Sequence, residues 1–357
     1  MFYRLSGIKH TRYASARALW PVPTDRRLVQ LLLLLGVAAP LLLSDLYLTS
    51  YMLPWLVWSA AALSLTLLMG MAGQLHFGFA AVLAIGAYTS IHAARAGIPF
   101  EIALILAGLA AAVIGAIFGG AALRVKGLYL VMATLAMHYL VQWVIVNVPV
   151  ISGGAQATLN TPDVRFLFIP IDGEISRYYL ALGWAVLVAL LLLNIKRTSL
   201  GRALVAVRDK DFAAAVIGVD PVRFKLTAFF AASFLGGVTG AVLVYAYYQA
   251  ATPEQFGFNV SIQAVAMVLV GGLGSVIGAF LGAGFVLLLP IVLTNLFSAL
   301  NGIEGLEIST NLIAHIPLMV YGGLIIFVLL YEPLGLAKIY DNLRKYFVVW
   351  PFRHTQS

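Results

Sequence analysis

The sequence contains no cysteine, and charged residues make up only 10% of its 357 residues. The absence of cysteine excludes disulfides, thiolate metal sites and thiol nucleophiles. Soluble domains carry about 25% charged residues, so this chain cannot cover its whole outside with water-soluble side chains. Hydrophobic residues make up 62%, and glycine adds 33 positions. The composition therefore predicts an all-α polytopic membrane protein whose outer surface faces lipid.

Motifs for catalysis and for nucleotide binding are also missing. The six histidines are scattered, with no HExxH pair, and there is no GxSxG nucleophile elbow. No GxxxxGKS/T phosphate loop occurs, so the chain is not expected to bind ATP in the P-loop manner. Few ionisable residues lie inside the apolar runs, which argues against ion-coupled pumping. We therefore expect neither an enzyme nor a chain that binds a cofactor or metal itself.

Apolar runs long enough to cross a bilayer, about 17 to 25 residues, recur along the chain. Three glycines, Gly271, Gly272 and Gly274, divide the longest run, Val260–Phe297, into one short helix and one full helix. Together with the other runs, this predicts about ten membrane-spanning helices, some of them short or broken. The other runs are Leu28–Ser44, Tyr51–Met69, Leu75–Ala94, Ile102–Leu123, Leu128–Val148, Tyr178–Ile195, Leu226–Tyr248 and Leu312–Tyr331.

The 22 Lys and Arg residues orient these helices, because all but Arg95, Arg165 and Arg177 gather in four segments. Ten crossings put the four segments on one side, which the positive-inside rule makes the cytoplasm. We predict a basic cytoplasmic segment over residues 1–27, a membrane domain over residues 28–337 and a basic cytoplasmic tail over residues 338–357. The four segments are residues 1–27, 124–126, 196–225 and 338–357. The remaining loops carry the acidic residues Asp163, Asp172, Glu174, Glu254, Glu304 and Glu307.

Two glycine-rich interruptions of apolar runs, Gly70–Gly78 and Gly271–Ser275, stand in opposite halves of the chain. Paired interruptions of this kind are typical of a transport pathway, because unwound backbone at membrane depth must line a cavity or pack inside protein. The alternative is a pair of short turns at the membrane surface, with His76 and Phe79 packed between helices. The pathway hypothesis predicts that both segments meet near the bilayer midplane. Its lining residues would be Gly73, Gln74, His76, Phe79, Gly271, Gly272, Gly274 and Ser275.

The longest basic loop, Lys196–Lys225, has the pattern of two short helices. Ser199 is expected to cap a helix over Leu200–Val207, and Asp211 a helix over Phe212–Ile217 that ends at Gly218. Two capped helices with apolar faces would make a docking surface for a cytoplasmic partner. The alternative is an amphipathic loop lying on anionic lipid. The expected docking residues are Arg202, Arg208, Asp209, Asp211, Ala213, Ala214 and Gly218.

Several stretches together resemble the LivM-type permeases, the membrane subunits of branched-chain amino acid ABC importers. The resemblance implies a multi-pass protein of a bacterial inner membrane with both termini in the cytoplasm. It also implies a second related permease, two cytoplasmic ATPase subunits that hold ATP and Mg, and an extracytoplasmic substrate-binding protein. In such families the loop with Ala213, Ala214 and Gly218 is the coupling helix that contacts the ATPase. The stretches are residues 73–81 (GQLHFGFAA), 85–88 (IGAY), 124–130 (RVKGLYL), 199–204 (SLGRAL), 253–258 (PEQFGF), 271–278 (GGLGSVIG) and 331–335 (YEPLG).

The sequence departs from the family pattern at two places. Phe212 stands where the coupling helix usually has Glu, and Asp211 lies one place earlier. His76 and Phe79 stand where the family commonly has Ser and His. Branched-chain or other hydrophobic amino acids are the expected substrates, with urea, amides and aromatic or other carboxylates as alternatives. A transporter or channel that needs no ATPase is the remaining alternative. Membrane lipid is an expected partner, and nucleic acid is not.

Overall fold

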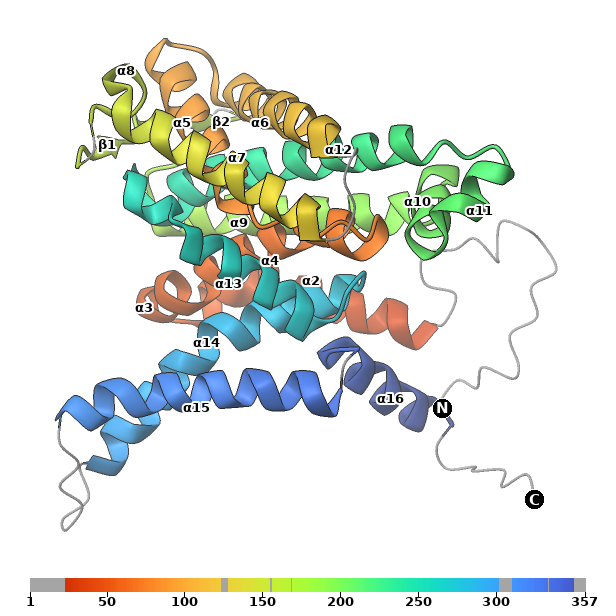
Figure 1. Cartoon of the computed structure of the whole chain (residues 1–357). Coiled ribbons are helices and arrows are strands. Elements are labelled where there is room, and N and C mark those ends of the chain that lie inside the picture. The colour runs from red at the N-terminus through yellow and green to blue at the C-terminus, as the bar shows by residue number, and fades with distance from the viewer. Residues whose placement is uncertain are drawn as a thin grey trace.

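The computed structural model describes residues 23–122, 128–154, 156–167, 169–301, 310–332 and 334–349, and most of them are helical (Figure 1). The first half contains the helices α2 (Pro23–Leu42), α3 (Asp45–Tyr47), η2 (Leu48–Met52), α4 (Leu53–Thr66), η3 (Leu67–Met71), α5 (Phe79–Arg95), α6 (Phe100–Ala122), α7 (Leu128–Asn147) and α8 (Pro149–Ser152). The second half contains α9 (Glu174–Ile195), α10 (Ser199–Asp209), α11 (Asp211–Val216), α12 (Pro221–Val242), η4 (Leu243–Tyr248), η5 (Pro253–Phe256), α13 (Phe258–Gly271), α14 (Val276–Asn301), α15 (Thr310–Tyr331) and α16 (Leu336–Val349). Two short antiparallel pairs join β1 (Leu159–Asn160) to β4 (Ala250–Ala251) and β2 (Arg165–Phe166) to β3 (Ile169–Pro170).

The prediction of an all-α polytopic membrane protein is confirmed. Among the described residues, six helices are long and apolar enough to cross a membrane. The other four predicted spans are helical as well, as α2, α5, α13 and α15. The six are Asp45–Met71, Phe100–Gly120, Tyr129–Asn147, Glu174–Ile195, Pro221–Tyr248 and Val276–Leu296.

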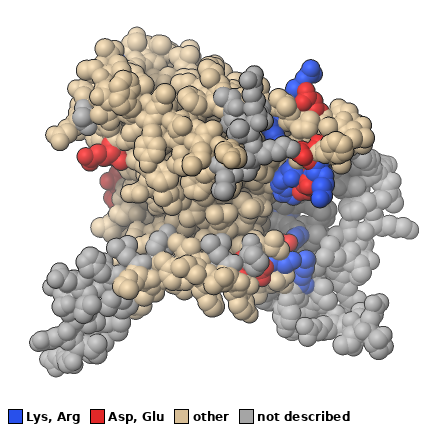
Figure 2. Space-filling model, in the orientation of Figure 1, with Lys and Arg blue, Asp and Glu red and all other residues tan. Residues whose placement is uncertain are grey.

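The helices run back and forth between two ends of the molecule (Figure 1). One end carries α10, α11 and α16, and the other carries α3, α8 and β1. Figure 2 shows blue Lys and Arg side chains gathered at the first end and red Asp and Glu side chains at the second. We call these the basic end and the acidic end. The exposed acidic residues described at the acidic end are Asp45, Asp163, Asp172, Glu174 and Glu254; Arg124, Lys126, Glu304 and Glu307 lie outside the described residues.

The centre of the bundle is formed by α4, α5 and α12. The spans Asp45–Met71 and Pro221–Tyr248 are largely buried, and α12 packs against α4, α5 and α6. A Cβ on Gly86 of α5 would lie 1.9 Å from the carbonyl oxygen of Gly237 on α12, so the two backbones touch. Such close approach lets helices pack through backbone van der Waals contact, which is the main source of helix association in lipid.

Helix ends differ from the predicted apolar runs at two places. α2 begins at Pro23, before the run Leu28–Ser44. α5 begins at Phe79 and not at Leu75, because residues 72–78 do not form helix. The predicted basic tail begins inside α16, whose apolar positions Leu336, Ile339 and Leu343 recur at helical spacing. That spacing could have indicated the helix.

Candidate translocation and coupling site

The first glycine interruption enters the bundle as non-helical chain. Residues 72–78 leave η3 and reach α5, with Gly73 in the left-handed region at a φ of 68°. The backbone N–H of Phe77 donates to Thr134 Oγ1 at 3.2 Å, and that of Ala80 donates to Ser261 Oγ at 2.9 Å. Thr134 and Ser261 are buried in the bundle. Side chains of α7 and α13 therefore satisfy backbone N–H groups that the broken helix leaves without helical partners.

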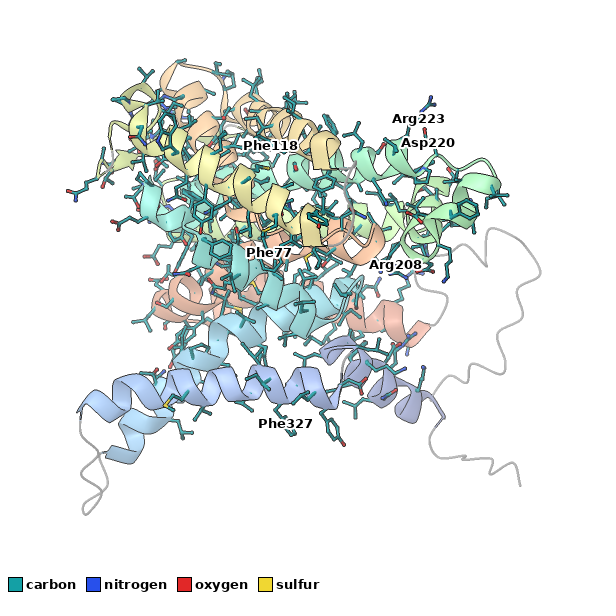
Figure 3. All side chains as sticks on the ribbon, viewed as in Figure 1. Phe77, Phe118, Arg208, Asp220, Arg223 and Phe327 are labelled. Atoms are coloured by element: carbon teal, nitrogen blue, oxygen red, sulfur yellow. The ribbon has the colours of Figure 1, made fainter. Side chains whose placement is uncertain are left out.

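Exposure alternates along this segment, as it does along an extended chain. Leu75 is 42% exposed and Phe77 is half-buried, whereas His76 and Gly78 are buried. Figure 3 shows Phe77 between α7 and α13. Every second residue of the segment therefore reaches the surface of the bundle, and the residues between them are enclosed by it.

His76 and Phe79, both expected to line a pathway, lie in the core of the chain. Each is 1% exposed. The ring centroids of His76 and Phe79 are 6.4 Å apart, and those of His76 and Phe229 are 5.7 Å apart, both edge to face. Neither ring nitrogen of His76 has a hydrogen-bond partner among the described residues. Helices of this chain enclose both side chains, as the alternative of packing between helices has it, and a role of His76 and Phe79 in a pathway stays a prediction.

The second glycine interruption is a tight turn between α13 and α14. Gly272 and Gly274 have φ angles of 112° and 81°, and Ser275 Oγ accepts a hydrogen bond from the N–H of Gly278 at 3.0 Å. The turn packs against the α15–α16 connection, since a Cβ on Gly272 would lie 2.6 Å from the carbonyl oxygen of Leu334. These contacts belong to the basic end, next to α16. The expectation of a midplane position is therefore corrected for Gly271, Gly272, Gly274 and Ser275.

The two interruptions nevertheless meet, at the basic end. A Cβ on Gly70 would lie 2.3 Å from the backbone nitrogen of Gly274. Lys196, just after α9, donates from Nζ to the carbonyl oxygen of Gly274. Partial burial of the ammonium group lowers the pKa of Lys196, and the charge of Arg208 lowers it further.

Arg208 of α10 connects the basic loop to the first interruption. Its Nη1 donates to the carbonyl oxygen of Gly70 at 2.7 Å, and its side chain packs on Gly73, whose Cβ would lie 2.6 Å from Arg208 Cγ. Figure 3 shows Arg208 at the inner side of α10, toward the bundle. Asp209 pairs with the same guanidinium at 2.9 Å. No sequence pattern indicated this contact, because a hydrogen bond from a side chain to a distant carbonyl leaves no periodicity.

The basic loop forms two helices as predicted, with shifted ends. α10 spans Ser199–Asp209 and is capped by Thr198, whose Oγ1 accepts from the N–H of Gly201 at 3.3 Å. α11 spans Asp211–Val216; Asp211 is its first residue and makes no cap, and its carboxylate lies 3.7 Å from Lys225 Nζ. Gly218 has a φ of 88°, as expected of a residue just past a helix C-terminus.

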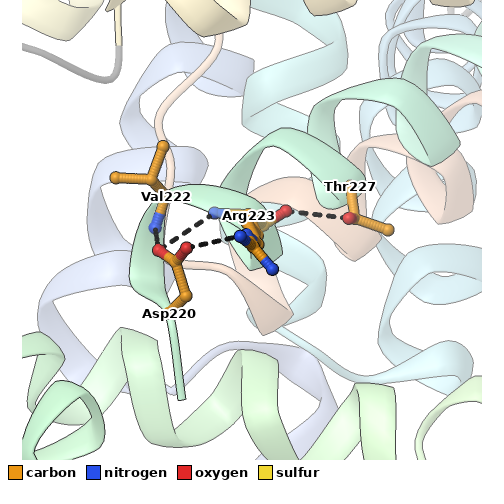
Figure 4. A network of polar contacts seen from close by, with 4 residues as sticks. All are labelled: Asp220, Val222, Arg223 and Thr227. Carbon is orange, nitrogen blue, oxygen red and sulfur yellow. Dashed lines mark hydrogen bonds and ion pairs between the residues drawn. The ribbon is translucent and has the colours of Figure 1, made fainter. Parts of the chain in front are cut away.

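The loop is fixed at its far side by the start of α12 (Figure 4). Asp220 Oδ1 accepts from the N–H of Val222 at 3.0 Å and of Arg223 at 3.4 Å, and Asp220 Oδ2 pairs with Arg223 Nε at 3.0 Å. Thr227 Oγ1 donates to the carbonyl oxygen of Arg223 at 2.8 Å. This N-cap satisfies two orphan donors of α12 and ends the loop at a defined position.

α11 presents apolar side chains to solvent at the basic end. Phe212 is 80% exposed, Val216 73% and Ile217 74%; we call these three residues the α11 patch. The buried Ala214 anchors the opposite face of the helix. Exposed charged residues stand close to the patch in the chain: Asp209, Lys210, Asp220 and Arg223.

The expected docking residues divide by exposure. Ala213 and Gly218 are exposed next to the α11 patch, and Arg202 is exposed on α10, where its Nη1 donates to the carbonyl oxygen of Arg197 at 3.0 Å. Ala214 is buried, and Arg208 faces inward to Gly70. Within the described residues no three His, Cys, Asp or Glu side chains come together to hold a metal ion.

Comparison with known proteins identifies relatives of this chain. LivM, the high-affinity branched-chain amino acid transport system permease protein, is 28% identical over 308 residues in both Salmonella typhimurium and Escherichia coli, covering 80% of this chain and 68% of each relative. LsrC, the autoinducer 2 import system permease protein of Klebsiella pneumoniae, is 37% identical over 121 residues, covering 31% of this chain and 34% of LsrC. No solved structure matches the chain. A family model matches residues 47–329, and the chain belongs to that family, the permease components of branched-chain amino acid transport systems.

Proposed function

We propose that this chain is one membrane-spanning half of an ATP-driven importer for branched-chain or other hydrophobic amino acids. The observation that carries the proposal is the α11 patch. Exposed apolar residues outside the membrane-spanning helices mark an interaction surface, and the charged residues near them fit an aqueous partner. Arg208 joins this surface to the broken segment at Gly70, so a partner that moves α10 and α11 also moves the pathway.

The proposed assembly has four kinds of subunit and is built on the two ends of the molecule. With the basic end in the cytoplasm of a bacterium, two ATPase subunits carrying ATP and Mg dock on the α11 patch and on its counterpart in a second, related permease. A substrate-binding protein docks at the acidic end. There Asp163, Asp172 and Glu254 are exposed and offer carboxylates to basic residues of that partner.

The proposed pathway passes along the outward face of the broken segment. Gly73, Leu75 and Phe77 take the place of His76 and Phe79 as its lining residues, because they reach the surface of the bundle. Gln74 is half-buried, and its Nε2 donates to the carbonyl oxygen of Ala72 at 3.1 Å. The apolar side chains suit a hydrophobic amino acid side chain better than urea or a short amide.

The likeness to LsrC supports a second candidate, the uptake of autoinducer 2, over about a third of the chain. The much longer likeness to LivM favours amino acids. Aromatic or other carboxylates stay open as substrates of the same machinery.

Reconstitution tests this proposal directly. The complete complex in proteoliposomes should take up leucine only with ATP inside and loaded binding protein outside. Autoinducer 2 and urea in excess should leave leucine uptake unchanged. Uptake of leucine by this chain alone, without ATP, would refute the proposed machinery. Competition by autoinducer 2 would keep the machinery and indicate autoinducer 2 as the substrate.

The coupling surface is tested at Gly218, where φ is 88° and a Cβ would meet no atom within 4 Å. Gly218→Val adds backbone strain of about 1–2 kcal/mol without a clash, so it should uncouple ATP hydrolysis from uptake while the protein still inserts. Gly218→Asn is the matched control, since Asn adopts the left-handed region more readily. Normal coupling in Gly218→Val would show that α11 does not transmit the motion.

A further inference from the structure

A groove of about 340 Å³ opens on the side of the bundle where α13, α14 and α15 pack together. Asn259, Ile262 and Gln263 of α13 line it, with Val286 and Pro290 of α14 and Ile325 of α15. Gln263 lies near the middle of Phe258–Gly271, and Pro290 near the middle of Val276–Asn301. The groove is therefore at membrane depth, away from both ends of the molecule.

Two amide side chains in this groove lack partners. Asn259 is exposed and Gln263 is half-buried, and neither side chain forms a hydrogen bond within the described part of the chain. Lipid tails cannot hydrogen-bond, so an amide that faced them would be left unsatisfied. Polar side chains inside membrane spans accordingly face a partner or a water-filled cavity.

Pro290 interrupts the backbone hydrogen bonding of α14 next to the groove. Proline has no backbone N–H, so the carbonyl oxygen of Val286, four residues earlier, receives no helical hydrogen bond from position 290. Val286 and Pro290 both line the groove. A carbonyl oxygen is an acceptor only, whereas each amide supplies both donors and an acceptor.

We infer that this groove binds the transported solute on its way across the membrane, and that the solute is a zwitterion with an apolar side chain. The amide N–H groups of Asn259 and Gln263 suit a carboxylate, and the carbonyl oxygen of Val286 suits an ammonium group. Ile262 and Ile325 offer apolar surface to the side chain. The residues described at the groove carry no formal charge, which favours a ligand whose own charges sum to zero.

This inference rests on the proposed function, and it adds a binding site for the solute and the way the solute would be held there. The volume of the groove fits a small-molecule site, since such sites measure about 300–1,000 Å³ and are mostly apolar with a few placed polar groups. A lipid chain and a helix of the second permease are the competing occupants. A helix of that partner could also satisfy the amides.

Cysteine labelling separates the three occupants, because the chain has no cysteine of its own. Ile325→Cys places a thiol in the groove, and Phe327→Cys is the matched control on the same helix. Phe327 is 60% exposed and points away from the bundle in Figure 3. The complete complex in proteoliposomes is treated with a membrane-impermeant methanethiosulfonate, with and without leucine and its loaded binding protein.

A solute groove predicts that Ile325→Cys reacts, that leucine slows the reaction several-fold and that Phe327→Cys stays unreactive. An unreactive Ile325→Cys would assign the groove to lipid. A thiol that instead cross-links to the second permease would assign it to the subunit interface. Either result overturns the inference.

Two substitutions of similar volume, Asn259→Leu and Gln263→Leu, supply an independent readout. They remove hydrogen bonds without opening a cavity, so leucine uptake should fall at least about tenfold while the complex still assembles. Unchanged uptake, or loss of assembly, would refute the inference. If the wild-type complex carries another solute and no leucine, the proposed substrate fails first, and protection of Ile325→Cys by that solute still tests the groove.

Discussion

The two glycine interruptions have similar sequences and different structures. Gly70–Gly78 opens into non-helical chain that runs into the bundle and is tied to side chains of α7 and α13. Gly271–Ser275 closes into a turn at the basic end, capped by its own Ser275. Both contain three glycines and polar residues in apolar surroundings. Composition therefore identifies a break in a helix but does not distinguish a deep segment from a surface turn.

The residues that come directly after each break explain the difference. After Gly274, Ser275 caps α14 at once, so the backbone N–H groups find a partner within the turn. After Gly73 no such cap comes in sequence, and the chain needs the distant hydroxyls of Thr134 and Ser261. A deep non-helical segment is thus maintained by other helices, whereas a surface turn is maintained locally.

The largest effect is expected where the two segments touch. Gly70→Ala would put its Cβ 2.3 Å from the backbone nitrogen of Gly274, and backbone cannot move aside as a flexible side chain can. Overpacking of a core costs about 1–3 kcal/mol and sometimes more, and we expect the upper end or beyond. The thermal midpoint of the purified complex should fall strongly.

Gly183→Ala in α9 is the control for this substitution, since no atom lies within 4 Å of its added Cβ. It should leave the midpoint unchanged or raise it slightly, because alanine favours helix over glycine. Equal midpoints for the Gly70 and Gly183 variants would disprove the contact between the two segments.

The second-largest effect is expected from the two cationic side chains that hold the glycine interruptions, Arg208 at Gly70 and Lys196 at Gly274. Arg208→Ala leaves the buried carbonyl of Gly70 without its donor, which costs about 1–3 kcal/mol, and it disconnects α10 from the broken segment. Leucine uptake per ATP hydrolysed should fall. Lys196→Ala frees the carbonyl of Gly274 in the same way but touches only the turn. It should lower stability with little effect on the ratio of uptake to hydrolysis. A larger fall of this ratio in Lys196→Ala than in Arg208→Ala would show that Lys196, and not Arg208, connects the two processes.

Much of the fold was predictable from the sequence, because it depends on hydrophobicity and charge. The nine apolar runs coincide with helices, and the glycines of Val260–Phe297 divide that run into two helices as predicted. The helix ends were less predictable. Leu75 is as apolar as the residues of the predicted helix, but it lies in the non-helical segment. Gly73 and Gly78 stand on either side of it, and Thr134 binds the backbone N–H of Phe77, two residues further on.

The candidate site was less predictable than the fold. The gathering of Ala213, Ala214 and Gly218 on one short helix and its end followed from local pattern. The burial of His76 and Phe79 depends on α12, which supplies Phe229 from a distant part of the chain. The same holds for the amides of α13, which share a groove with Pro290 only because α13 and α14 fold back on each other.

A smaller effect compares the two hydroxyl caps. Ser261→Ala removes a fully buried acceptor for the N–H of Ala80, whereas Ser275→Ala removes a half-buried one for Gly278. Loss of a cap costs about 0.5–2 kcal/mol, and water can replace only the exposed partner. The midpoint should therefore fall further for Ser261→Ala. A larger loss for Ser275→Ala would show that water reaches the broken segment and that it is no deeper than the turn.

The smallest effect is a pH dependence confined to the turn. The pKa of Lys196 in the folded chain is lowered from 10.5, so the folded state releases its proton at lower pH than the unfolded state does. Between the two pKa values the unfolded state binds more protons, and stability rises with pH. The midpoint of the wild type relative to Lys196→Met should thus increase as the pH approaches 10.5 and level off above it. The change should stay below about 1 kcal/mol, because solvent reaches this side chain and screens its charge. Arg208→Met removes one of the two causes that lower the pKa of Lys196 and should narrow the pH window. A midpoint difference that stays flat from neutral pH to 10.5 would mean that Lys196 is fully hydrated and does not hold the carbonyl of Gly274.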